Sequence, residues 1–125
     1  MTLVTAEEIA EFRIKLADYP EAMRSLDAIE DCEGDLEDAA MGIAIKIGLE
    51  PELSNTEWLA SLAKKCRAII CQQDFRVDLI NGDFAAIWSL LVSSNLCPKL
   101  LILPVLMYVF EQGVNKFCEP LDNLV

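Results

Sequence analysis

The sequence predicts an all-α protein, a single compact bundle of five to six helices that spans residues 1–125. Apolar residues recur at helical spacing in several segments, as in Ile9, Phe12 and Leu16, and this spacing places them on one helix face. Helix-start signals stand directly before two such segments. With 54% hydrophobic residues, a chain of this length can bury a sizeable core without the help of disulfides or metals.

The first three helices are bounded by residues with defined roles at helix ends. Thr5 and Glu8 form a capping box, so the first helix begins here. It ends just before Pro20, because a proline disfavours helix in the residue that precedes it and can itself open the next helix. Gly34 closes the second helix, and Asp35 provides a side-chain cap for the third.

Two segments alternate apolar and polar residues and therefore fit a strand as well as a helix. Residues 43–47 lie between Gly42 and Gly48, and residues 75–79 come shortly before a turn at Asn81. If both segments were strands, they could pair as a short two-stranded ribbon. An α+β fold with this ribbon is therefore the alternative to the all-α bundle.

The second half of the chain predicts longer helices. A second capping box begins at Ser54, and Asp83 caps a helix over residues 84–94. The last helix, over residues 98–118, contains Pro104, whose ring removes the hydrogen bond to the carbonyl four residues earlier. We therefore expect a kink or a restart at Pro104. The helix after Ser54 carries its inward side chains at Trp58, Leu62, Cys66, Ile69 and Ile70.

Charge is distributed unevenly along the chain, which has a net charge of −11. Residues 1–38 hold 12 of the 21 acidic side chains, whereas residues 84–110 contain a single charge, Lys99. An anionic surface repels phosphate backbones and anionic lipid headgroups, so we expect no nucleic-acid partner and no membrane association. Ser93 and Pro98 lie in breaks that divide the apolar stretch into two parts, each too short to cross a bilayer alone.

The five cysteines are expected to be free thiols in a cytoplasmic protein, because the N-terminal residues do not resemble a signal peptide. They form no CxxC motif, and the chain has no histidine, so the common zinc patterns are absent. Cys66 is flanked by Lys65 and Arg67, and cationic neighbours favour a reactive thiolate. Its place on the apolar helix face favours a buried, unreactive thiol instead.

The densest group of acids is the segment of residues 27–38, here called the acidic segment. Asp31, Glu33 and Asp35 alternate like calcium ligands and are the candidate metal residues, although Leu36 stands where a calcium loop of this type needs glycine. Exposed acids at a junction between helices are the plainer interpretation. A docking face for a basic protein partner is a further reading, with candidate residues Glu30, Asp31, Glu33, Asp35, Glu37 and Asp38.

The apolar C-terminal part offers a second candidate surface. Trp88, Met107 and Tyr108 could line an apolar pocket, or they could simply pack in the core. A helix that is apolar on most of its circumference is either central or covered by another subunit, so we expect a homodimer. The residues assigned to this pocket or interface are Trp88, Leu106, Met107, Tyr108 and Phe110.

These patterns favour a non-enzymatic protein–protein interaction or regulatory protein of the cytoplasm, without a cofactor. Nucleophilic catalysis that pairs serine or cysteine with histidine is impossible in a chain without histidine. Two alternatives remain: a small metal-dependent enzyme that uses carboxylates, and a carrier that holds an apolar small molecule between the C-terminal helices. No motif in the sequence identifies a family.

Overall fold

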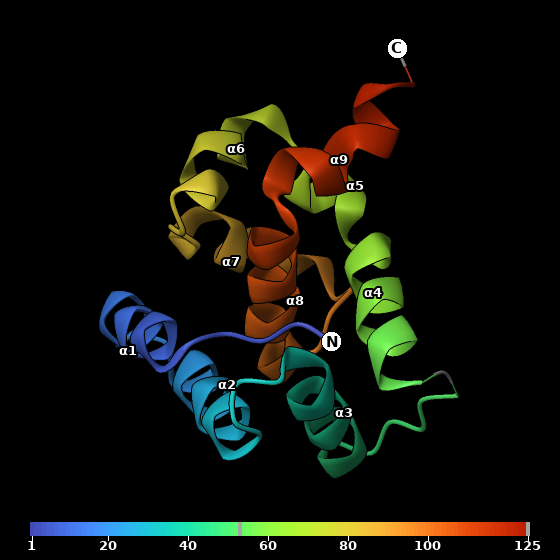
Figure 1. Ribbon diagram of the computed structural model, residues 1–125. Helices are drawn as coiled ribbons and strands as arrows, with labels where there is room; N and C mark the ends of the chain where they lie inside the picture. Colours follow the sequence, from blue (N-terminus) through green and yellow to red (C-terminus); the bar gives the residue numbers. More distant parts are fainter. Residues whose placement is uncertain (53, 125) are drawn as a thin grey trace.

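The computed structural model describes residues 1–52 and 54–124, and it arranges this part of the chain in nine helices without a strand (Figure 1). The all-α prediction is confirmed, whereas five to six helices is too few. A lone antiparallel bridge joins Leu3 to Asp35. The helices are α1 (Ala6–Lys15), α2 (Pro20–Asp31), α3 (Leu36–Lys46), α4 (Asn55–Lys65), α5 (Arg67–Ile70), α6 (Gln73–Ile80), α7 (Ala85–Ser94), α8 (Lys99–Gln112) and α9 (Val114–Asp122).

The predicted helix starts are confirmed where a side chain caps the helix. The Thr5 hydroxyl accepts from the Glu8 amide at 3.1 Å, and the Glu8 carboxylate accepts from the Thr5 amide at 3.1 Å. Asp35 accepts from the backbone amide at the third position of α3, and Ser54 does the same for α4. Pro20 is the first residue of α2, where its missing N–H would have had no partner in the helix.

Both segments of the proposed two-stranded ribbon are helical, so the α+β alternative is wrong. Residues 43–46 finish α3 and Ile47 is its C-cap, while residues 75–79 lie within α6. The alternation of apolar and polar residues suggested a strand with one buried face. Two of the apolar residues face solvent instead, since Ile45 is 62% exposed and Val77 is 68% exposed. Arg76 would face away from the apolar side of such a strand, but in α6 it is buried.

The extra helices arise from breaks that the hydrophobic pattern does not reveal. The helix that begins after Ser54 stops at Cys66, and the short α5 continues in a new direction. The predicted helix 98–118 breaks at Gly113, whose φ of +97° belongs to the left-handed region that favours glycine. As a result, α8 and α9 meet at 89°.

Pro104 does not interrupt α8, so the expected restart there is wrong. The proline removes the donor that would normally satisfy the Leu100 carbonyl. Ser25, a fully buried residue of α2, supplies the replacement, because its hydroxyl donates to the Leu100 oxygen at 2.6 Å. A neighbouring helix thus satisfies the polar group that the proline leaves without its helical partner.

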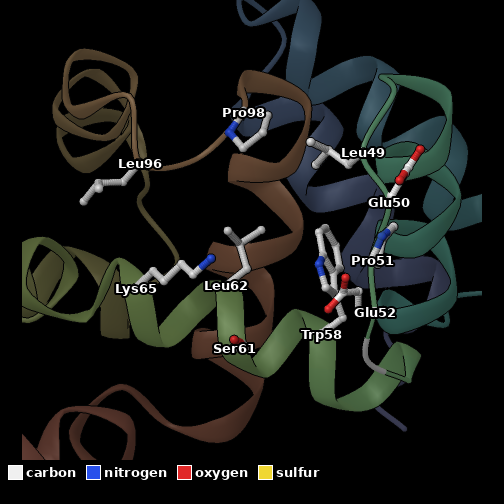
Figure 2. A pocket seen from close by; sticks show the side chains of 10 residues that line it. All are labelled: Leu49, Glu50, Pro51, Glu52, Trp58, Ser61, Leu62, Lys65, Leu96 and Pro98. Carbon is white, nitrogen blue, oxygen red and sulfur yellow. The ribbon is translucent and has the colours of Figure 1, made fainter.

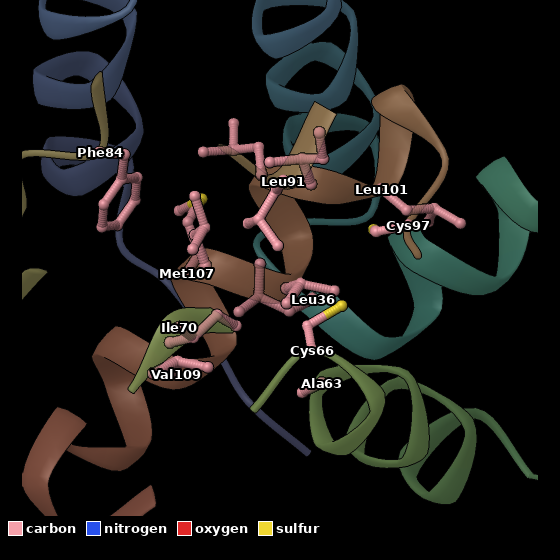
Figure 3. Packing of buried hydrophobic residues seen from close by; sticks show 14 of the residues in the cluster. Leu36, Ala63, Cys66, Ile70, Phe84, Leu91, Cys97, Leu101, Met107 and Val109 are labelled. Carbon is pink, nitrogen blue, oxygen red and sulfur yellow. The ribbon is translucent and has the colours of Figure 1, made fainter. Parts of the chain in front are cut away.

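Helix α8 is the central element and packs against α2, α3, α4, α7 and α9 (Figure 1). Its side chains from Leu101 to Leu103 and from Val105 to Met107 have no exposed surface, and they lie in one hydrophobic cluster (Figure 3). The chain itself therefore covers the helix whose apolar character suggested a second subunit. Of the residues assigned to a pocket or interface, Trp88, Leu106 and Met107 are buried, while Tyr108 and Phe110 are half-buried.

Helices α5, α6 and α9 form a corner that is held by covalent and ionic contacts. Cys71 and Cys118 are joined by a disulfide with a Cα–Cα distance of 5.5 Å, so the expectation of five free thiols is wrong for this pair. Arg76 donates to the Cys71 carbonyl at 3.0 Å and to the Asp122 carboxylate at 2.8 Å. Cys32, Cys66 and Cys97 are free. Disulfides are rare in a reducing cytoplasm, so this bond does not fit the expected cytoplasmic location.

Among the described residues, no single helix is long and apolar enough to span a membrane. Helices α8 and α9 reach the necessary length and composition only when they are taken together, and the sharp bend at Gly113 separates them.

Candidate functional site

The N-terminal residues of the chain pack against the acidic segment. The Val4 amide donates to the Gly34 carbonyl at 2.9 Å, and the Leu36 amide donates to the Thr2 carbonyl at 3.0 Å. Gly34 has a φ of +87°, and a Cβ atom added there would lie 2.3 Å from the Val4 oxygen. Only glycine fits this close approach of two backbones.

Glu37, predicted as part of an exposed docking face, is only 2% exposed. Its two carboxylate oxygens accept from the Thr2 amide at 2.5 Å and from the Thr2 hydroxyl at 2.7 Å. These hydrogen bonds satisfy the buried carboxyl oxygens and fix the N-terminal residues against α3. Glu37 therefore has a structural role and is not presented to a partner.

The other five acids of the predicted docking face lie at or near the surface, but three of them already have partners. Glu30 accepts from Arg13 at 2.8 Å, Asp35 caps α3, and Asp38 accepts from the side-chain amide of Asn55. Asp31 and Glu33 are exposed at the end of α2 and in the turn that follows. Charge removal at these two positions would leave the helix caps and ion pairs intact.

The metal candidates Asp31, Glu33 and Asp35 do not form a ligand set. Within the described parts of the chain, no group of three or more His, Cys, Asp or Glu side chains could hold a metal ion. Asp35 turns toward the amide of Asp38 as a helix cap, and a carboxylate used in this way is directed away from a shared site. The EF-hand-like alternation in the sequence thus has no geometric counterpart.

A pocket of about 420 Å³ lies beside α4, and we call it the α4 groove. Its walls come from three segments: α4 itself, the chain that follows α3, and the loop between α7 and α8 (Figure 2). The capping at Ser54 sets the direction of α4, and this direction turns Trp58, Leu62 and Lys65 toward the other two walls. The lining residues are Leu49, Glu50, Pro51, Glu52, Trp58, Ser61, Leu62, Lys65, Leu96 and Pro98.

The α4 groove is apolar inside and charged at its edge. Leu62 is buried at its base and Trp58 is half-buried, while Leu96 remains 47% exposed at the opposite wall. Glu50 and Glu52 are exposed on one side, and Lys65 is exposed on another. Such a site can hold an apolar side chain against the indole and favour a positive charge beside the two carboxylates.

Cys66 and Cys97 belong to the same hydrophobic cluster. Cys66 ends α4, Cys97 belongs to the α7–α8 loop, and both thiols are buried in the hydrophobic cluster, where the Cys66 sulfur points toward Cys97 (Figure 3). The hydrogen bond from Cys97 lowers the pKa of Cys66, the burial of Cys66 opposes this shift, and the charge of Lys65 adds to it. The same hydrogen bond and burial raise the pKa of Cys97.

A pair of carboxyl groups joins the ends of α1 and α8. Burial and the neighbouring Glu8 raise the pKa of Glu111 to about 7, whereas the pKa of Glu8 is lowered, chiefly by its hydrogen bond with Glu111. As an ionised group, Glu111 would leave its buried Oε1 atom without a donor. A proton held on Glu111 and donated to Glu8 resolves this, so the pair carries one charge at pH values below about 7 and a second charge above it.

Sequence reasoning did not find the groove or the two pairs, because each joins residues far apart in the chain. Trp58 was assigned to the core from its helical spacing. The proline at position 51 and the proline at position 98, which shape two of the walls, are the available sequence signal. Comparison of the chain with protein-family models, curated proteins and solved structures gave no significant match.

Proposed function

We propose that this protein is a non-enzymatic interaction module that binds a basic segment of another protein through the α4 groove. The observation that supports this is the combination of a half-buried Trp58 with exposed Leu49 and Leu96 around one pocket. Tryptophan with surrounding aliphatic contacts is typical of the residues that dominate binding energy at protein interfaces.

Charge complementarity supports a basic partner. Glu50 and Glu52 border the groove, and the rest of the surface adds to a net charge of −11. This field accelerates the approach of a cationic segment, and burial of an apolar anchor then holds it. The exposed acids Asp31 and Glu33 would contribute to the long-range attraction without touching the ligand. In this proposal the acidic segment attracts the cationic partner at long range, and the α4 groove binds its apolar side chain.

The test uses short synthetic peptides in which one leucine, phenylalanine or tryptophan is flanked by lysines, with glutamate-flanked peptides for comparison. Amide chemical shifts are recorded during titration at low and high salt. We expect the lysine-flanked peptides alone to shift resonances of the α4 groove, with weaker affinity at high salt. Shifts confined to Asp31 and Glu33, or no shifts, would contradict the proposal. Groove shifts that depend on protein concentration without peptide would identify a second copy of the chain as the occupant.

Variants separate the contribution of the apolar groove walls from that of the acidic residues. Leu96→Ser should weaken binding by about tenfold or more, because it removes the apolar side chain of the wall that faces α4. Ile14→Ser is the matched control, since Ile14 is exposed to 80% on α1 and does not line the groove. Replacement of Glu50 and Glu52 by glutamine should mainly reduce the salt dependence and the association rate.

A further inference from the structure

We propose that a cavity between α2, α3 and the start of α8 binds a small monocarboxylate with a short apolar chain. These three helices pack against one another (Figure 1). The cavity, here called the α2–α3–α8 cavity, has a volume of about 290 Å³ and is lined by residues 24–28 of α2 without Leu26, by Ile43 and Lys46 of α3, and by Leu100 of α8. It shares no lining residue with the α4 groove and is therefore a second, separate site.

The floor of the α2–α3–α8 cavity is apolar. Ser25 is fully buried, and its hydroxyl lies 2.6 Å from the Leu100 carbonyl oxygen and 3.0 Å from the Glu21 carbonyl oxygen, so its single proton is already committed. Ile43 is 6% exposed, and Ala28 and Leu100 are half-buried. These side chains can pack against an alkyl chain, whereas a polar group in the same place would lose its hydration without gaining a donor.

The rim of the cavity carries two positive charges. Arg24 and Lys46 are exposed, and neither forms an ion pair with a residue in the ranges 1–52 and 54–124. Asp27, the acid of the lining, is bonded to Arg13 at 2.9 Å and to neither cation of the rim. Acidic residues outnumber basic ones by 21 to 10 in this chain, so two cations without a carboxylate partner at one cavity stand out against its composition.

The positions of the two cations in their helices separate a structural role from a binding role. Lys46 lies in the last turn of α3, where a positive charge also stabilises the helix dipole. Arg24 lies in the middle of α2, where the dipole gains nothing from it. Arg24 is therefore the residue that points most directly to an anionic ligand. Its guanidinium can donate two parallel hydrogen bonds to a carboxylate, and the Lys46 ammonium can add a further contact.

The charge of the whole protein selects among anions. With a net charge of −11, the protein repels a dianion about twice as strongly as a monoanion at long range, which disfavours a phosphate group. A monocarboxylate is repelled less, and its alkyl chain gains hydrophobic free energy at the buried floor. An alkyl ammonium ion is disfavoured by the two cations of the rim, and a neutral alcohol gains nothing from either charge.

The experiment titrates the unaltered protein with hexanoate and follows the amide chemical shifts. Hexan-1-ol lacks the charge of hexanoate, hexylamine reverses it, and inorganic phosphate lacks the alkyl chain. We expect hexanoate to shift the resonances of Arg24, Ile43 and Lys46 until saturation, with an affinity about tenfold or more above that of each other probe. Equal affinity for hexan-1-ol or for phosphate would overturn the proposal, and so would the absence of saturable shifts with hexanoate.

Variants then locate the charge that holds the carboxylate. Arg24→Gln should weaken hexanoate binding by about tenfold, because the paired hydrogen bonds of the guanidinium are lost, and Lys46→Gln should weaken it less. Lys116→Gln is the matched control, since it removes the same charge from an exposed position on α9 that does not line the cavity. Equal weakening in all three variants would assign the effect to net charge and overturn the proposal, as would unchanged binding in Arg24→Gln.

Discussion

The centre of the molecule and its α5–α6–α9 corner are stabilised by different forces. Around α8, residues such as Leu103 are buried on all sides, and the hydrophobic effect acts without direction. At the corner, a disulfide and the buried Arg76 provide a few directional ties. The difference teaches that a short helix with a small apolar face, such as the four-residue α5, relies on specific bonds where a long central helix relies on burial.

The largest expected effect is at the centre. Leu103→Ala should reduce the free energy of unfolding by about 3–5 kcal/mol, because it removes a fully buried side chain and leaves a cavity. Urea unfolding monitored by circular dichroism measures this, with the exposed Leu96→Ala as control. A loss below that of the corner variants would reverse the proposed contrast between the two regions.

The disulfide is the next largest contribution. Replacement of Cys71 and Cys118 together by alanine should reduce the free energy of unfolding by about 2–4 kcal/mol, since the bond closes a loop with a sequence separation of 47 residues. Cys32→Ala serves as the control. Hydrogen exchange should show faster opening in α9 than in α8. Uniform acceleration through both helices would mean that the corner and the centre unfold as one unit.

The next prediction concerns the buried hydrogen bond between Ser25 and the Leu100 carbonyl, a polar contact inside the apolar centre. Ser25→Ala should cost about 1–3 kcal/mol, because the Leu100 carbonyl opposite Pro104 would lose its donor. Ser93→Ala is the matched control, since that hydroxyl also donates to a helix carbonyl but lies on the exposed side of α7. Equal thermal stability of the two variants would show that Pro104 needs no support from α2.

The smallest effect concerns pH at the carboxyl pair. The folded protein keeps a proton on Glu111 up to a pKa of about 7, whereas the unfolded chain releases it near the ordinary value of 4.5. Stability should therefore decline as the pH rises from about 4.5 to about 7, and then level off. The lowered pKa of Glu8 acts in the other direction and removes stability in acid, below its ordinary range.

Thermal melts between about pH 5 and about pH 8 measure this decline. Glu111→Gln should flatten it, because the amide imitates the protonated acid, while Glu119→Gln on the exposed side of α9 should preserve it. The same slope in both variants would assign the pH dependence to other groups.

Local signals predicted much of the fold, because capping at Thr5, Asp35 and Ser54 depends on residues three positions apart. The central place of α8 followed from its uniform apolarity. The breaks at Cys66 and Gly113 depend on how the following segment packs. A glycine in the sequence permits a bend but does not show that the chain bends there. Pro104 suggested a new helix start, but α8 continues through it, and Ser25 of α2 donates to the carbonyl that the proline leaves without its helical partner.

The sites were less predictable than the fold. Glu37 was grouped with exposed acids because composition records charge and not burial. The Cys71–Cys118 bond could not be chosen from spacing alone, since five cysteines permit many pairings. Trp58 has the periodicity of a core residue, and only the neighbouring loops make it the side of a groove. In each case the property belongs to contacts between segments distant in sequence.

The position of α8 along the chain also has a consequence for synthesis on the ribosome. Helices α2, α3 and α4 all pack against a helix that begins at Lys99, so most of their burial has to wait until that segment has left the exit tunnel. Until then the apolar faces of α2, α3 and α4 are exposed, because α8, against which they pack, has not yet been made. The acidic residues of positions 1–38 repel other chains by their charge during this time. Helices α2, α3 and α4 thus complete their burial only after α8 has been synthesised.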